Sequence, residues 1–290
     1  MGRDPAATLA IGGVRFVLQH PGTVPTRAPE PIYREFLAAD ASFEVPLRIQ
    51  HDPLPPLGWR RLRYRPNYLW AVRETAAGFL LGVREGSPRR PPGRLLSLDR
   101  RWTRGDIFVR QGEDGSAPHP LGFPLDVVLV TGVLAHHGGV VVHAAAAVVD
   151  GRGLVFAGRS GAGKTTIARV LRAAGVEVVG DERVVLRAAG DAILLHGTPW
   201  PGDLGVVSPR SAPVAGLFFL EHGPATRTAT LTPAAAGRAL LPRCRLPFWD
   251  RAAMAGVLDT VAEIVRRVPC QRLRFRPDGS VVEVLARVVR

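Results

Sequence analysis

The chain has 290 residues, 46% of them hydrophobic, and a formal net charge of +13. This length and apolar content allow a sizeable core in one large or two ordinary domains, and they exclude a mainly disordered chain. The charge divides almost evenly, about +6 over residues 1–115 and about +7 over residues 116–290. Because no single basic surface stands out, we do not expect a nucleic-acid partner.

The cysteine content and the N-terminus favour a cytoplasmic protein. The two cysteines lack metal-ligand spacing and are too few for a secreted disulfide scaffold, so we expect reduced thiols. The N-terminus has no apolar signal core, and the longest apolar run, about residues 138–149, is too short to cross a bilayer. We therefore expect no membrane contact. The oligomeric state stays open, with a homo-oligomer among the alternatives.

The first part of the chain predicts a β-rich module. Residues 1–115 hold many prolines and short alternating runs separated by turn residues, at 61–65, 68–72 and 78–83. The composition then becomes polar and turn-forming around residues 111–120. This change marks a domain boundary, so we divide the chain into residues 1–115 and 116–290.

The second part predicts an α/β domain with an α+β tendency and a mixed sheet. Strands dominate the stretch right after the expected helix at 166–174, unlike the regular alternation of strands and helices in a doubly wound fold. The expected elements, in order, are a helix over 124–137, strands over 140–149 and 153–157, a helix over 166–174, strands over 176–180, 183–188, 192–196 and 216–220, helices over 233–241 and about 249–267, a strand over 270–276 and a last helix after Gly279.

The chain's one lysine points to a phosphate site. Of the 38 basic side chains only Lys164 is not arginine, and it lies in Gly158-Arg-Ser-Gly-Ala-Gly-Lys-Thr165. This spacing is typical of loops whose backbone N–H groups and lysine hold nucleotide phosphates, and it falls between an expected strand and an expected helix. The alternative is a glycine-rich turn with a stray lysine. The residues expected to bind the nucleotide are Gly158, Ser160, Gly161, Ala162, Gly163, Lys164, Thr165 and Thr166.

Phosphoryl transfer also needs a metal ligand and a base. The Thr165 hydroxyl is the expected ligand of Mg²⁺, and Asp181 and Glu182 supply carboxylates at a strand end. Glu221, which ends a strongly apolar strand, is a further metal-ligand candidate. His143, which lies on an apolar strand, is another candidate functional residue. These residues also have plainer interpretations: Asp181 and Glu182 could form a simple turn, and His143 could be a hydrogen-bonded core residue.

These residues carry a resemblance to a known family. Val142-His-Ala-Ala-Ala, the loop at 158–166 and Gly180-Asp-Glu-Arg-Val184 resemble the catalytic domain of the HPr serine kinase/phosphorylase family. His196-Gly-Thr-Pro-Trp-Pro-Gly202, Leu217–Gly223 and Leu246–Trp249 resemble the shorter HPr-kinase-like proteins, some of which accompany peptide-maturation enzymes, including those of lasso-peptide pathways. The resemblance implies a phosphate-loop kinase fold of the type shared with phosphoenolpyruvate carboxykinase, preceded by a smaller β-rich domain.

The resemblance also implies roles. Lys164 would bind the transferring phosphate, Thr165 would ligate Mg²⁺, Asp181 would be the base, and His143 would lie beside the acceptor. The chain departs from the family at Glu182, where a second aspartate is usual, and near Leu194, where a metal-binding glutamate is missing; Glu221 or Asp203 would compensate. The signature of the reverse reaction is not recognisable, so phosphorylase activity is not predicted.

We therefore expect an ATP- and Mg²⁺-dependent kinase that acts on the serine of a small peptide or protein, such as a ribosomal peptide precursor. A small-metabolite kinase and a nucleotide-binding regulatory protein without turnover are the alternatives. Four arginines are candidate contacts to an acidic substrate or the transferring phosphate, with plain surface arginines as the alternative: Arg243, Arg245, Arg272 and Arg274.

Overall fold

The protein, seen in a computed structural model, divides into two compact units. The first comprises Met1–His136 and Pro247–Ala253, and the second His137–Leu246 and Met254–Arg290. The expected boundary at residue 115 lies inside the first unit. Part of the boundary segment, residues 113–116, is outside the described residues. The structure describes residues 7–20, 31–37, 39–51, 53–55, 61–84, 89, 91–112 and 117–289.

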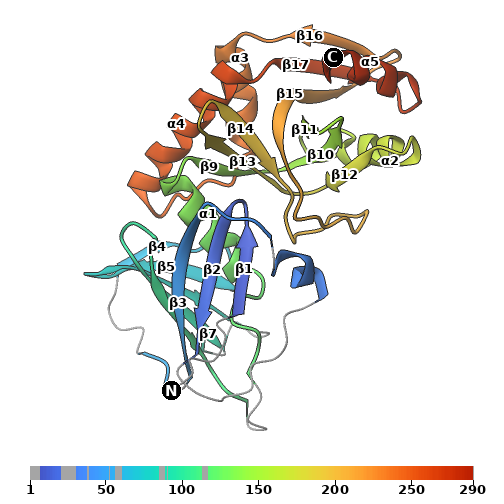
Figure 1. The fold of residues 1–290 in the computed structure, drawn as a ribbon. Coiled ribbons are helices and arrows are strands. Elements are labelled where there is room, and N and C mark those ends of the chain that lie inside the picture. Colours follow the sequence, from blue (N-terminus) through green and yellow to red (C-terminus); the bar gives the residue numbers. More distant parts are fainter. Residues whose placement is uncertain are drawn as a thin grey trace. The chain divides into compact units, whose positions relative to one another are not determined.

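The first unit is built on an eight-stranded sheet, in the order β1-β2-β3-β8-β7-β6-β5-β4 (Figure 1). β3 runs parallel to both β2 and β8, and the other neighbours are antiparallel. The strands are β1 (Ala7–Ile11), β2 (Val14–Gln19), β3 (Phe43–His51), β4 (Arg61–Tyr64), β5 (Trp70–Glu74), β6 (Gly78–Val83), β7 (Arg94–Asp99) and β8 (Gly105–Val109), with a 3₁₀ helix η1 (Pro31–Phe36).

Helix α1 (Leu125–His136) is held within the first unit by a tryptophan and an aspartate. A Cβ added at Gly132 would lie 2.3 Å from the Trp102 ring, so only glycine allows this approach. The Trp102 indole N–H donates to Asp250 Oδ2 at 3.1 Å, and His136 Nε2 lies 2.9 Å from the same oxygen. Asp250 Oδ1 accepts from the amides of Ala252 and Ala253. Residues 247–253 therefore belong with the first unit although they are distant from it in sequence.

The second unit has a nine-stranded mixed sheet, as expected. Its main path is β12-β10-β11-β15-β14-β13-β9, and β17 adds to β15 and β16 to β17. β15 is parallel to β11 and β17, whereas the other pairs are antiparallel. The strands are β9 (Gly139–Val142), β10 (Ala144–Val149), β11 (Arg152–Ala157), β12 (Glu177–Gly180), β13 (Val184–Ala189), β14 (Ala192–His196), β15 (Ser211–His222), β16 (Arg227–Thr230) and β17 (Cys270–Phe275).

The second unit also contains helices α2 (Lys164–Ala173), α3 (Pro233–Leu240) and α5 (Ser280–Val289), a 3₁₀ turn η2 (Leu241–Arg243) after α3, and all of α4 (Arg251–Arg267) but its first three residues. Ile167 and Leu171, one helical turn apart on α2, belong to a buried cluster with Phe156 of β11 and Phe218 of β15. The two phenylalanine rings stack at 5.5 Å. This packing fixes α2 against the strands that frame the glycine loop. Within the described ranges, no helix combines the length and apolar character needed to cross a membrane.

Two strands differ from the sequence expectation. The predicted strand over 140–149 is two strands that separate at His143: β9 pairs with β13, whereas β10 pairs with β11 and β12. The apolar run hides this break because both strands are almost fully buried. β16 was not predicted, because all four of its residues are exposed and it lacks an apolar face.

Candidate active site

The glycine loop, residues 158–163, connects β11 directly to α2. Gly161 and Gly163 have φ angles of 78° and 96°, in the left-handed region that favours glycine. A Cβ on Gly158 would lie 2.7 Å from the Ala162 Cβ, and one on Gly163 would lie 2.9 Å from the Phe275 ring. All three glycines of the sequence pattern are therefore required by the loop's conformation or packing.

The loop leaves the start of α2 without a side-chain cap. Gly163 is the N-cap residue and no side chain bonds the first-turn amides; the bond from Ile167 N to the Gly163 carbonyl, at 2.8 Å, begins the helix. Uncapped N–H groups at a helix start carry partial positive charge and favour an anion.

Lys164 folds back onto the loop. Its Nζ donates to the carbonyl oxygens of Gly158 at 3.4 Å and Arg159 at 3.2 Å, and the residue is only 7% exposed. Burial lowers the pKa of Lys164, the Glu182 carboxylate opposes this, and the Arg243 charge adds to the lowering. The ammonium thus bonds only neutral carbonyls, so an incoming anion would stabilise it.

His143 and Glu182 are in contact with each other. His143 Nδ1 lies 2.9 Å from the carbonyl oxygen of Glu182 and 3.4 Å from its Oε2. Because a carbonyl only accepts, Nδ1 carries the proton and the neutral ring leaves Nε2 as an acceptor. Burial, together with Lys164 and Arg183, lowers the pKa of His143, against the opposing effect of Glu182. The imidazole is therefore held mainly neutral at pH 7.

One cavity of about 730 Å³ is lined by His143, Glu182 and the start of the loop, Gly158–Ser160, whereas Lys164 and the rest of the loop are not part of its lining. The charged residues that line the cavity are four arginines and one glutamate, Glu182. The cavity therefore favours a ligand that carries several negative charges. Cys244 also lines it, and burial raises the pKa of this thiol to about 12. Both cysteines are free. The lining residues are His143, Gly158, Arg159, Ser160, Glu182, Arg238, Ala239, Pro242, Arg243, Cys244 and Arg245.

Asp181, the expected base, does not line this cavity. Its side chain is buried, with Oδ1 accepting from the Gly202 amide at 3.0 Å and Oδ2 from the Leu204 amide at 2.8 Å. A Cβ at Gly202 would lie 2.6 Å from Asp181 Oδ2. The structure therefore separates the acidic pair: Asp181 holds the 202–204 segment, and Glu182 faces the cavity.

Glu221, the further metal-ligand candidate, is bound to two arginines instead. Its carboxylate lies 2.9 Å from Arg272 Nε and 3.1 Å from Arg274 Nε. None of these three residues lines the cavity, whereas Arg243 and Arg245 do. The four arginines singled out in the sequence thus divide into two at the site and two paired with Glu221. Asp203 is exposed and also lies outside the lining. Across the described residues, no three His, Cys, Asp or Glu side chains cluster as a metal site.

Sequence reasoning missed one neighbour of the loop. His222 Nε2 lies 2.7 Å from the Gly161 carbonyl oxygen. His222 ends β15, which runs parallel to β11, the strand that leads into the loop. Since adjacent parallel strands end at the same sheet edge, the sequence would have indicated this contact had the strand order been known.

The chain matches one protein-family model and a number of solved structures. A protein-family model described as SynChlorMet cassette protein ScmC matches residues 124–290. The solved structure described as the Hpr(Ser) kinase/phosphatase from Coxiella burnetii is 15% identical, over 52% of this chain and 93% of that chain, with a TM-score of 0.30. At that TM-score nothing further follows from the likeness. No curated protein matches.

Proposed function

The chain belongs to the family of SynChlorMet cassette protein ScmC, and from the geometry of its cavity we propose that it is an ATP- and Mg²⁺-dependent kinase. The acceptor is a hydroxyl, on the serine of a small peptide or protein. One observation carries the proposal: the first three residues of the glycine loop, Gly158–Ser160, line the same arginine-rich cavity as Glu182 and His143. A phosphate-binding loop and a carboxylate at one cavity are the parts that phosphoryl transfer requires.

The nucleotide phosphates would bind at the glycine loop, whose first residues line the cavity. The uncapped amides at the start of α2 and the buried Lys164 ammonium offer the donors that phosphate oxygens need. Ser160 lines the cavity beside them. Lys164 would exchange two neutral carbonyl partners for phosphate oxygens, which favours binding because the ammonium is desolvated.

Magnesium would be held by the Thr165 hydroxyl and the Glu182 carboxylate, together with phosphate oxygens. Mg²⁺ typically takes only one or two protein carboxylates and completes its shell with phosphate and water, so a dedicated cluster of acids is not needed. Bound ATP and Mg²⁺ would supply the phosphoryl group and the cation that screens its oxygens.

Glu182, rather than Asp181, is the proposed base. Glu182 lines the cavity and accepts the proton of the acceptor hydroxyl, whereas both oxygens of Asp181 accept backbone amides. Arg183 lies 3.3 Å from Glu182 Oε1 and His143 3.4 Å from Oε2. These contacts orient the carboxylate. Arg159 and Arg243 line the same cavity and stabilise negative charge that develops on transfer.

The test incubates the protein with γ-labelled ATP, Mg²⁺ and either serine-containing peptides or a pool of small hydroxylated metabolites. We expect label on a peptide serine, with ADP formed in equal amount. Label found only in the metabolite pool would replace the peptide acceptor. ATP binding without transfer to either pool would identify a regulatory protein instead.

A further inference from the structure

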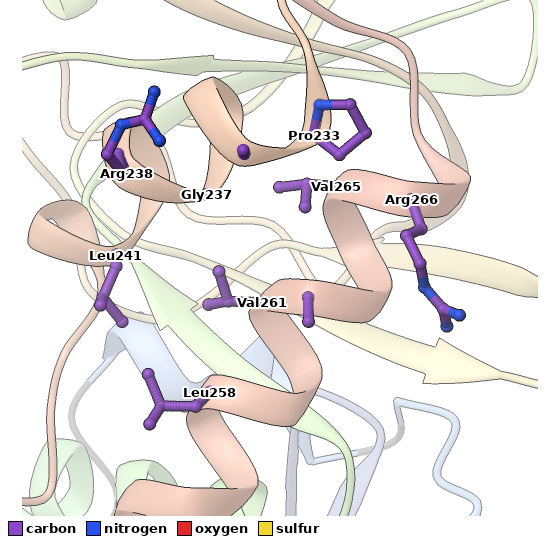
Figure 2. Close-up of a pocket in the computed structure, with 10 residues that line it drawn as sticks. Pro233, Gly237, Arg238, Leu241, Leu258, Val261, Val265 and Arg266 are labelled. Atoms are coloured by element: carbon purple, nitrogen blue, oxygen red, sulfur yellow. The ribbon is translucent and has the colours of Figure 1, made fainter.

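A second cavity lies between α3 and α4, outside the catalytic machinery (Figure 2). It has a volume of about 450 Å³ and an almost entirely apolar surface. Figure 2 shows Leu258, Val261 and Val265 along α4 facing Gly237 and Leu241 of the α3–η2 segment. We call this cavity the α3–α4 groove. Its lining residues are Pro233, Ala234, Gly237, Arg238, Leu241, Leu258, Val261, Ala262, Val265 and Arg266.

The groove has the size of a binding site for a few side chains. Leu258 is 48% exposed, so an apolar ligand would remove its surface from water. The volume falls within the range of about 300–1,000 Å³ that small-ligand sites occupy. Stable contact between two subunits covers about 800 Å² on each partner, an area suited to a broad face rather than a narrow groove.

Gly237 keeps the groove open. It lies inside α3, where glycine costs about 0.5–1 kcal/mol relative to alanine, and its φ is not in the left-handed region. A Cβ at this position would meet no atom within 4 Å. Neither the backbone nor the packing therefore requires glycine here. The absence of a side chain at Gly237 leaves the space of the groove empty.

Two arginines flank the apolar surface. Figure 2 shows Arg238 on one side and Arg266 on the other. Neither guanidinium forms an ion pair with any residue the structure describes, and the lining contains no acidic side chain. Acidic residues next to an apolar stretch would pair with these charges, so the groove favours an apolar segment with acidic neighbours.

The groove and the active-site cavity adjoin at Arg238, on the α3–η2 segment. Arg238 lines both cavities, and the adjacent Ala239, Pro242 and Arg243 line the active-site cavity alone. A chain that lies in the groove and passes over Arg238 would reach the cavity of Glu182. A peptide is the ligand that is long enough to fill both places at once.

We infer that the α3–α4 groove binds the acceptor peptide, taking a short apolar stretch whose acidic neighbours pair with Arg238 and Arg266 while the serine lies at Glu182. The inference rests on the proposed function for the role of the serine. Groove binding itself requires no phosphoryl transfer, so it is measured separately.

The experiment uses the full chain and four fluorescein-labelled peptides. The probe is Leu-Leu-Asp-Asp-Gly-Ser-Gly; in the other three peptides the leucines are replaced by glycine, the aspartates by asparagine, or both. Peptide binding is followed by fluorescence anisotropy, and transfer by γ-labelled ATP. Gly237→Leu fills the groove, Arg266→Glu reverses one flanking charge, and Gly237→Ala is the matched control because alanine leaves most of the space open. ATP affinity and melting temperature are measured for every variant.

We expect the probe to bind at least about tenfold more tightly than the doubly replaced peptide, the effect of burying one leucine-sized side chain. Gly237→Leu should remove this preference, Arg266→Glu should weaken the preference for aspartate, and Gly237→Ala should change neither. If Gly237→Leu folds, binds ATP and leaves probe binding unchanged, the groove is not the peptide site, whether or not serine is phosphorylated. A dimer that Gly237→Leu dissociates would likewise overturn the inference. Groove-dependent binding without transfer would support the groove and reject the kinase.

Discussion

His143 Nδ1 donates to the backbone carbonyl of Glu182 at 2.9 Å, and this bond joins the end of β9 to the residue that faces the active-site cavity. His143 also donates its own amide to the Arg243 carbonyl at 2.8 Å. The histidine therefore connects Glu182 to the segment that bears Arg243. The interruption between β9 and β10 at His143, which the sequence does not reveal, allows both contacts.

Glu182→Gln should abolish catalysis while leaving the affinity for ATP without Mg²⁺ nearly unchanged. Glutamine keeps the size of the side chain but cannot accept the acceptor's proton, and such general-base losses are about 10²–10⁴-fold in kcat. Label transfer and ATP binding by calorimetry check this. Glu221→Gln is the matched control, since Glu221 pairs with Arg272 and Arg274 outside the cavity. Equal loss in both variants would reject the assignment.

Asp181→Asn should act first on stability. Asparagine presents an NH₂ group to one of the two backbone amides that the carboxylate accepts from, Gly202 or Leu204, leaving a buried donor unpaired. Such a loss costs about 1–3 kcal/mol of unfolding free energy. Urea denaturation measures it. A fully stable Asp181→Asn variant that binds ATP but cannot transfer phosphate would return the base role to Asp181.

The sequence predicted the parts of the fold that depend on local pattern, including the strand and the helix on either side of the glycine loop. The loop's glycines and Lys164 follow from spacing, and the mixed sheet follows from the run of strands after the loop helix. It did not predict which member of the acidic pair faces the cavity, because that depends on the 202–204 segment folding back onto Asp181. Nor did it predict the partners of Glu221, which come from β17, some fifty residues later in the chain. Both features depend on contacts between residues that are far apart in the sequence, and hydrophobic periodicity does not indicate such contacts.

Acid should destabilise the protein through His196. Burial, aided by the charge of Arg187, lowers the pKa of His196 from 6.5 to about 4. The unfolded chain therefore binds this proton first, and stability is lost as the pH falls from about 6.5 to about 4, by about 3 kcal/mol in total. Urea unfolding at several pH values should show a shallower pH dependence in His196→Leu than in the wild type. An unchanged slope would mean that this imidazole is not held neutral by the fold. His119, whose pKa is also lowered to about 4, keeps its own contribution in both proteins.

Lys164→Ala and Lys164→Arg should both weaken ATP binding. The ammonium lies buried between the carbonyls of Gly158 and Arg159, and the wider, planar guanidinium cannot take this place. Calorimetry with ATP and Mg²⁺ should show at least about a tenfold loss of affinity for either variant, since charged hydrogen bonds contribute about 1.5–3 kcal/mol. Wild-type affinity in Lys164→Arg would show that the site needs only a positive charge.

His222→Ala should raise KM for ATP several-fold and leave KM for the peptide unchanged. Because a carbonyl only accepts, His222 Nε2 donates to Gly161 at 2.7 Å, and a neutral hydrogen bond of this kind contributes about 0.5–1.5 kcal/mol. Its loss frees the loop on the nucleotide side, whereas Glu182 and the groove stay in place. His222→Gln, which restores a donor, should recover part of the affinity. A change in KM for the peptide alone would instead place His222 on the acceptor side of the cavity.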